Sequence, residues 1–249
     1  YEDWFDSELY EVVYNSRDLA DAERLADLIV RIASPAPGAE ILDVGTGRGR
    51  HARTLAKRGF RTTGLDLSPR AVETARARAE AEGLADRTAF VTGDMRVARF
   101  HRRFDGVVNL FSSFGYFEDE ADHGRAIGAM AAALRPGGWL VQDLLNPPYL
   151  AAHLVPEDER KAGGLHVRQQ RGLVEREGRL RVEKRITLTP EEGEPYVYTE
   201  SVRLLTAGEL AAFYQEAGLE IVARYGDYDG HPLTDASPRL ILHAIRTGG

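Results

Sequence analysis

Short apolar runs alternate with amphipathic stretches along most of the chain. A first run carries Asp43 into a cluster of glycines, and later runs predict strands at 61–66, 88–92, 104–110, 138–144, 219–225 and 239–246. Helical signals lie between them: Ser68 and Pro69 predict an N-cap and first turn, and Gly83 predicts the end of that helix. Strands that alternate with helices predict an α/β fold, with a mostly parallel sheet and helices on both faces.

The alternation stops after Pro148. Residues 165–205 show a period of two, with turn signals at 177–178 and 192–193, which predicts antiparallel strands. We therefore expect an antiparallel β insertion after the fifth strand. The expected division is a core at 1–148, the insertion at 149–205 and the completion of the core at 206–249.

Helices are predicted on both sides of these segments. Residues 4–31 show a helical pattern, with an apolar face that includes Leu25 and Ile29. Thr206 and Glu209 form a capping-box pattern, which opens a helix that ends near Gly218.

The stretch 43–49, Asp-Val-Gly-Thr-Gly-Arg-Gly, predicts a binding loop. Its glycines allow left-handed turns and a close approach of the backbone to a ligand, next to the N-terminus of the following helix. Gly47, Gly49 and Ala52, with Asp66 further on, also match the dinucleotide pattern of nucleotide-dependent oxidoreductases. However, the carboxylate of Asp43 would repel a pyrophosphate and suits a cationic ligand, such as the ammonium of a methionine moiety.

Further polar groups stand at the ends of the next strands. Asp66 ends the second strand, where a carboxylate can accept both hydroxyls of a ribose. The third strand ends at 93–95, where Asp94 offers an acceptor for an adenine amino group and Met95 an apolar contact for its face. The fourth opens onto Asn109 and Leu110. Successive strand ends with carboxylates are far more specific than the glycines alone.

These motifs together resemble those of the class I S-adenosylmethionine-dependent methyltransferases, in particular a bacterial group of small-molecule enzymes. The shared patterns are D-x-G-x-G-x-G-R-H-A at 43–52, G-x-D-x-S at 64–68, N-x-F-x-S-x-G-Y-F at 109–117 and S-P-R-L at 237–240. The resemblance implies a Rossmann-like seven-stranded sheet whose last strand runs antiparallel. It also implies S-adenosylmethionine as cofactor, S-adenosylhomocysteine as product, and an insertion that acts as a lid or a dimer element.

The resemblance also implies site residues. Those expected at the cofactor are Tyr10, Tyr14, Asp43, Gly45, Thr46, Gly47, Asp66, Leu67, Asp94, Met95, Asn109 and Leu110. Those expected near the methyl acceptor are Phe111, Phe114, Tyr116 and Tyr228.

Two expectations concern the N-terminal segment. In similar enzymes a tyrosine from this segment closes over the cofactor, and Tyr10 and Tyr14 are the candidates; the alternative is that they pack on the core. Many relatives also supply an arginine to the methionine carboxylate from here. Asp21 stands at that spacing, so Arg17 or Arg24 would have to take this role.

Composition narrows the classes of function. The chain of 249 residues has no cysteine, which excludes disulfides and a thiol nucleophile, and its net charge of −7 argues against a nucleic-acid substrate. No apolar run is long enough for a membrane span, and no signal peptide is visible, so a cytoplasmic location is expected.

Residues 146–149, Asn-Pro-Pro-Tyr, spell a motif with which nucleic-acid amino-methyltransferases hold a target base. In those enzymes it follows the fourth strand, whereas here it follows the fifth. The alternative interpretation is a chain that leaves the sheet, where two prolines prevent a helix.

The predicted function is transfer of a methyl group from S-adenosylmethionine to a nitrogen or oxygen of a small molecule, with no nucleic-acid or membrane partner and a homodimer through the insertion as one option. His231 is the candidate general base, with a plain surface histidine as the alternative. The histidines show no metal-ligand spacing, so we expect no metal. A nucleotide-dependent oxidoreductase, a nucleic-acid methyltransferase and a non-catalytic cofactor-binding protein remain as alternatives.

Overall fold

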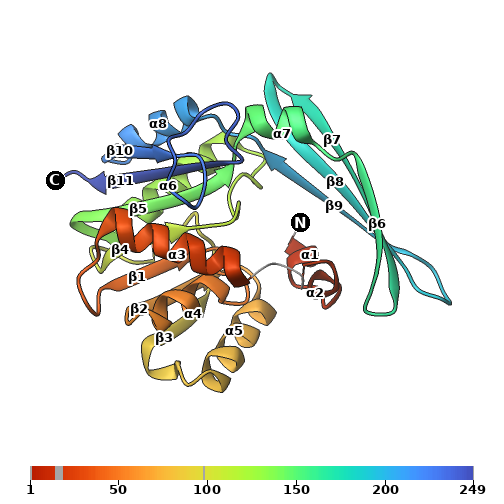
Figure 1. The fold of residues 1–249 in the computed structure, drawn as a ribbon, viewed down its shortest axis with the longest axis horizontal. Helices are drawn as coiled ribbons and strands as arrows, with labels where there is room; N and C mark the ends of the chain where they lie inside the picture. Colours follow the sequence, from red (N-terminus) through yellow and green to blue (C-terminus); the bar gives the residue numbers. More distant parts are fainter. Residues whose placement is uncertain (1, 15–18, 98, 249) are drawn as a thin grey trace.

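The computed structural model describes residues 2–14, 19–97 and 99–248, and its main body is a twisted seven-stranded sheet (Figure 1). The strand order is β10-β11-β5-β4-β1-β2-β3, with β11 antiparallel to both of its neighbours and the other pairs parallel. The strands are β1 (Glu40–Val44), β2 (Arg61–Asp66), β3 (Thr88–Thr92), β4 (Phe104–Asn109), β5 (Leu134–Leu145), β10 (Leu219–Tyr225) and β11 (Arg239–Arg246). The predicted Rossmann-like sheet with an antiparallel last strand is confirmed.

Helices cover both faces of this sheet. One face packs against α3 (Leu19–Ala33), α4 (Arg50–Lys57) and α5 (Pro69–Ala81), and the other against α6 (Glu120–Ala133) and α8 (Ala207–Glu216). A short 3-10 helix occupies Ala85–Arg87. The predicted caps form: Ser68 Oγ accepts the Ala71 N–H of α5, and Thr206 and Glu209 make a full capping box on α8.

A second sheet of four antiparallel strands is inserted between β5 and α8. Its strands, in order, are β6 (Glu157–Ala162), β7 (Leu165–Arg176), β8 (Arg179–Thr189) and β9 (Tyr196–Arg203). Figure 1 shows these strands projecting away from the main sheet. The antiparallel β insertion after the fifth strand is therefore confirmed.

The expected helix at 4–31 is interrupted. The described part of this segment holds three helices, α1 (Glu2–Phe5), α2 (Leu9–Tyr14) and α3, and the first two pack on the insertion instead of the main sheet (Figure 1). Trp4 and Val13 join Val167, Ile186 and Leu188 in a separate apolar cluster. The interruption at 6–8 has a local cause, because Ser7 Oγ accepts the N–H of Leu9 and so caps the start of α2.

The expectation that two prolines prevent a helix after β5 is wrong. Helix α7 (Pro147–His153) begins with both prolines in its first turn. Proline is tolerated there because the first N–H groups of a helix have no partner within the helix and the fixed φ of proline is already helical. None of the described helices is long and apolar enough to span a membrane.

Candidate active site

A cavity of about 240 Å³ lies at the carboxyl ends of β1 to β4. Parallel pairing places these ends side by side, since Asp43 is opposite both Gly64 and Val108, and Asp66 is opposite Thr92. Eight of the predicted cofactor residues line the cavity from this side: Gly45, Thr46, Gly47, Asp66, Leu67, Asp94, Met95 and Leu110. The loop and the strand ends predicted from the sequence therefore meet at one cavity.

The glycine loop closes against the segment after β4. Gly45 and Gly47 have φ values of 72° and 54°, in the left-handed region that favours glycine. A side chain at position 45 would place its Cβ 2.7 Å from Cβ of Ser113, which is too close for any packing. Glycine is therefore needed at 45 for both backbone conformation and space.

Asp66 and Asp43 occupy different places around this loop. The Asp66 carboxylate lies at the cavity wall and accepts the backbone N–H groups of Gly47 (2.7 Å) and Ser68 (3.0 Å). Burial raises the pKa of Asp66. Asp43 is almost fully buried behind the loop, where its carboxylate accepts the Thr46 hydroxyl at 2.6 Å. Burial raises the pKa of Asp43 to about 6. Direct contact between Asp43 and the cofactor stays a prediction.

Asp94 reaches the cavity while it is held by a neighbour. Both of its carboxylate oxygens accept from the Arg96 guanidinium, which lowers the pKa of Asp94. Arg96 also pairs with Asp122 at 2.8 Å. The Asp94 side chain is thereby kept charged and fixed in direction.

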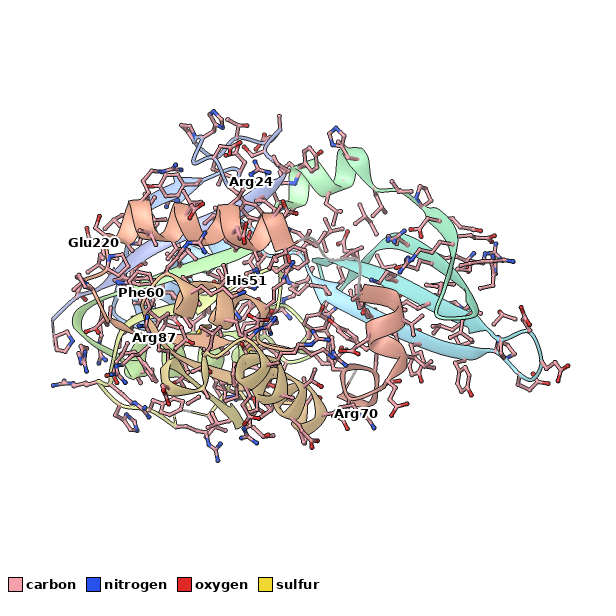
Figure 2. The ribbon with its side chains drawn as sticks, turned by 60° about the horizontal axis from the view of Figure 1, so that its bottom comes forward. Arg24, His51, Phe60, Arg70, Arg87 and Glu220 are labelled. Atoms are coloured by element: carbon pink, nitrogen blue, oxygen red, sulfur yellow. The ribbon has the colours of Figure 1, made fainter. Side chains whose placement is uncertain are left out.

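Aromatic side chains also line the cavity. Phe5, Tyr10 and Tyr14 come from the N-terminal helices, and Phe111 and Tyr116 from the segment after β4. The N-terminal helices also form ion pairs with the glycine loop and with α5. Glu11 pairs with Arg48 (2.6 Å) and Arg78 (2.9 Å). Glu8 pairs with Arg70 (2.6 Å), which is labelled in Figure 2. These helices thus span the cavity between the main sheet and the insertion.

The segment after β4 is held in an unusual conformation. Phe111 and Ser112 both have positive φ, 56° and 60°. The fully buried carboxylate of Asp143 accepts the Phe111 N–H (3.0 Å), the Tyr228 hydroxyl (3.1 Å) and Arg239 Nε (2.7 Å). Asp143 and Arg239 therefore hold Phe111 and Ser112, which line the cavity, although neither Asp143 nor Arg239 was predicted as a site residue.

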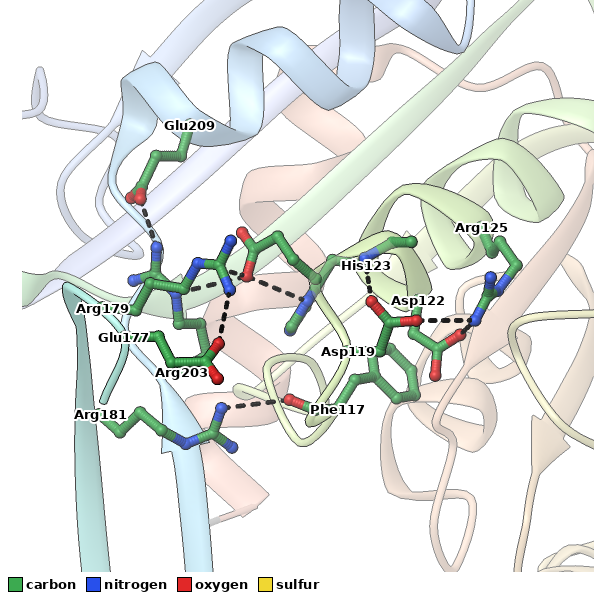
Figure 3. Close-up of polar contacts among 12 residues, drawn as sticks. Phe117, Asp119, Asp122, His123, Arg125, Glu177, Arg179, Arg181, Arg203 and Glu209 are labelled. Atoms are coloured by element: carbon green, nitrogen blue, oxygen red, sulfur yellow. Dashed lines mark hydrogen bonds and ion pairs between the residues drawn. The ribbon is translucent and has the colours of Figure 1, made fainter. Parts of the chain in front are cut away.

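The insertion is fastened to the far end of the same segment. Arg181 of β8 donates to the Phe117 carbonyl oxygen (3.1 Å), and the Arg203 N–H of β9 donates to that of Gly115 (2.7 Å). Figure 3 shows Arg181 reaching Phe117, close to Arg203 and its partner Glu209. The insertion thereby borders the cavity through Tyr116 and Phe117 and through the N-terminal helices.

Several predicted residues lie elsewhere. Asn109 and Phe114 are buried in the protein interior, and Tyr228 does not line the cavity; its hydroxyl bonds Asp143. The His231 side chain is 72% exposed, bonds Asp227 at 2.8 Å and does not line the cavity, so this geometry gives no support to His231 as a base. Arg24 pairs with Asp229 at 2.9 Å, and Arg17 lies outside the described residues.

Some lining residues were missed. The lining residues that were not predicted include Phe5, Glu11, Arg48, Arg50, His51 and Arg78. The R-G-R-H run at 48–51, directly after the glycines, was the available signal for three of them.

Comparison with known proteins identifies the family. Residues 41–138 match the model of a methyltransferase domain. A dTDP-3-amino-3,4,6-trideoxy-alpha-D-glucopyranose N,N-dimethyltransferase of Streptomyces venezuelae is 31% identical over 234 residues, which cover 91% of this chain and 95% of that protein. The chain belongs to the S-adenosylmethionine-dependent methyltransferases. This methyltransferase transfers the methyl group of S-adenosylmethionine to a nitrogen or oxygen of a small molecule.

Solved structures of methyltransferases share the fold. The S-adenosylmethionine-bound amino pentose methyltransferase of Micromonospora echinaspora superimposes with a TM-score of 0.72 at 27% identity, covering 97% of this chain and 98% of that one. A sugar N-methyltransferase of a Streptoalloteichus species gives 0.72 at 26% identity, covering 97% and 94%. The predicted methyltransferase function is confirmed over two of its alternatives, a nucleotide-dependent oxidoreductase and a non-catalytic cofactor-binding protein.

Proposed function

We propose that this methyltransferase methylates the amino nitrogen of a deoxyamino sugar. The observation that carries the proposal is the set of aromatic and hydroxyl-bearing side chains that line the same cavity as the strand ends: Tyr10, Tyr14, Phe111 and Tyr116. Aromatic faces pack against the apolar face of a sugar ring, and tyrosine hydroxyls hydrogen-bond its polar groups. The Streptomyces venezuelae relative and both solved structures named above are described as acting on amino sugars or on sugar nitrogen.

Residue roles at the cofactor follow from the same geometry. Asp66 would accept the ribose hydroxyls, Leu67, Met95 and Leu110 would contact the adenine, and Asp94 would accept its amino group. The fit is chemical: carboxylate oxygens at the wall match hydroxyl and amino donors, and the apolar side chains between them match a flat aromatic ring.

The chain has a limited task in the reaction. S-adenosylmethionine supplies a methyl group already activated on a sulfonium, so positive charge passes to the accepting nitrogen on transfer. Phe5, Tyr10 and Tyr14 cover the cavity and exclude water, and Tyr116 with Phe111 orients the sugar. A neutral amine attacks with its own lone pair and loses a proton only after transfer, so the attack needs no general base, which agrees with the position of His231 outside the cavity.

The remaining partner predictions are part of the proposal. The acidic net charge and the cover over the cavity support a small acceptor and no nucleic acid. A homodimer through the insertion stays a prediction, which sedimentation would test directly. The outer face of the inserted sheet carries exposed ion pairs such as Arg168–Glu157 (2.6 Å). A cytoplasmic location also stays a prediction.

The acceptor class is tested by a matched pair of sugars. The protein, supplied with radiolabelled S-adenosylmethionine, is offered dTDP-3-amino-3,6-dideoxyglucose or the dTDP-sugar with a hydroxyl at the same carbon. We expect kcat/KM for the amine to exceed that for the alcohol by at least about a hundredfold, because a site built for an amino group discriminates by several kcal/mol. Transfer only to the alcohol would overturn the proposal.

A further inference from the structure

Helices α1 and α2 lie between α5 and the inserted sheet (Figure 1), and the insertion holds them by apolar contacts. Trp4 and Val13 are 1% and 3% exposed and pack against β7 and β8 in one apolar cluster. Trp4 and Tyr14 also donate to the buried carboxylate of Glu200, each at 2.6 Å. Separation of the helices from the insertion would therefore expose apolar surface and remove two donors from a buried charge.

The opposite side of the same helices is held by charges. Apart from Arg48, the paired side chains on this side are 39% to 79% exposed. Exposed ion pairs contribute little, because water solvates the charges once they separate. The contacts, here called the ionic seam, are Glu11–Arg48 (2.6 Å), Glu11–Arg78 (2.9 Å), Glu8–Arg70 (2.6 Å), and Asp6 to the Ser68 hydroxyl (2.6 Å) and to the Arg70 N–H (3.2 Å).

The ionic seam runs from solvent to the cavity. At its outer end the Glu8 side chain is 79% exposed and does not line the cavity. At its inner end Glu11, Arg48 and Arg78 are cavity-lining residues. Two ring contacts cross to the main body at this end, Phe5–Tyr116 at 5.1 Å and Tyr10–Arg48 at 5.0 Å. Separation along the seam would thus connect the cavity to solvent.

We propose that S-adenosylmethionine enters and S-adenosylhomocysteine leaves through the ionic seam, when α1 and α2 part from α5 and the glycine loop but stay attached to the insertion. The seam separates more easily than the apolar side, because its charges are hydrated when it opens. Closure returns Phe5, Tyr10 and Tyr14 to the cavity and excludes water before transfer. The inference concerns the cofactor and does not depend on the identity of the acceptor.

The first test links the two sides of the seam. The chain has no cysteine, and Glu8→Cys/Arg70→Cys places one on each side, at positions that do not line the cavity. The protein is loaded with tritiated S-adenosylhomocysteine, linked with a bifunctional maleimide that contains a cleavable disulfide bond, and mixed with excess unlabelled ligand. We expect the linker to slow release by at least about tenfold, because the opening step is blocked, and its cleavage to restore the rate.

A matched control links α2 to the insertion. A Cβ at position 163 would lie 3.8 Å from that of Val12, the usual separation in a disulfide, so oxidation can close Val12→Cys/Gly163→Cys. Because α2 and the insertion are proposed to move together, this disulfide should leave the release rate unchanged. Slower release in the oxidised control, or unchanged release from the linked Glu8→Cys/Arg70→Cys protein, would overturn the inference.

A variant without cysteines decides independently, also if the control pair does not fold. Asp6→Ala/Glu8→Gln weakens the outer end of the seam and changes no cavity residue. Easier opening should raise the association and release rates of S-adenosylhomocysteine by a similar factor, about three- to tenfold, with Kd nearly unchanged. Glu157→Gln, on the outer face of the insertion, should change neither rate. Unchanged rates in Asp6→Ala/Glu8→Gln, or faster release alone, would contradict the seam as the route of the cofactor.

Discussion

The Asn109 side chain donates from Nδ2 to the Val44 carbonyl oxygen at 2.8 Å, and so ties the end of β4 to the end of β1. Asn109 Oδ1 in turn accepts from Gln142 (2.9 Å), whose Oε1 accepts the Tyr214 hydroxyl (2.9 Å). All three side chains are fully buried. This chain of bonds fixes the point where the glycine loop leaves the sheet.

Asn109→Ala should therefore lower the free energy of unfolding by about 2 to 4 kcal/mol, because the Val44 carbonyl and the Gln142 amide lose their partners in the interior. Urea unfolding measures the change. Tyr214→Phe removes only the outer bond and should cost about 1 kcal/mol. Equal losses in the two variants would argue against a special role for Asn109.

Asp66→Ala should weaken binding of S-adenosylhomocysteine by roughly 1.5 to 3 kcal/mol, because a charged acceptor for the ribose hydroxyls is lost. Calorimetry gives the affinity, and Asp86→Ala on the surface serves as control. Unchanged affinity in Asp66→Ala would show that the ribose is held elsewhere.

Asp43 predicts a pH dependence of stability in the cofactor-free protein. Its folded pKa of about 6 lies above the ordinary value of 3.8, so the folded state favours the protonated form and stability falls as the pH rises through 6. Asp43→Asn removes this cost while it keeps an acceptor for Thr46. It should stabilise the protein by about 1 to 3 kcal/mol at pH 7.5 and by about half as much at pH 5. An equal gain at both pH values would refute the ionisation argument.

Asp143→Asn should destabilise the protein by about 3 to 5 kcal/mol, since it leaves the guanidinium of Arg239 largely buried without its carboxylate. The double variant Asp143→Asn/Arg239→Leu removes that charge and should be more stable than the single variant. If thermal unfolding ranks the double variant lower, the ion pair is not the source of the loss.

The sequence was sufficient where local signals and strand order determine the structure. The Ser68 cap and the Thr206–Glu209 capping box depend only on neighbouring residues. The carboxyl ends of parallel strands lie at one edge of the sheet, so Asp66 and Asp94 could be predicted to lie together at the cavity that they line. The class of cofactor was implied by the resemblance of these motifs to those of the class I methyltransferases.

The rest depends on contacts between distant segments. No local pattern says that Asp143 will support Phe111, or that α1 and α2 will pack on the insertion. Glu200 left one signal, a charged residue at an inward position of a period-two strand, but its meaning depends on Tyr14, 186 residues away in the chain. His231 was chosen by the expected position of its loop, and the structure shows that the side chain turns to Asp227.

The most direct test of the account is the identity of the atom that receives the methyl group. The protein is incubated with S-adenosylmethionine carrying a ¹³C-methyl group and with dTDP-3-amino-3,6-dideoxyglucose, and the product is analysed by NMR. We expect the labelled methyl carbon to correlate through the nitrogen with C3 of the sugar. A labelled methyl group on a sugar oxygen, or no transfer by protein that binds S-adenosylhomocysteine normally, would contradict the proposal that this enzyme methylates an amino sugar.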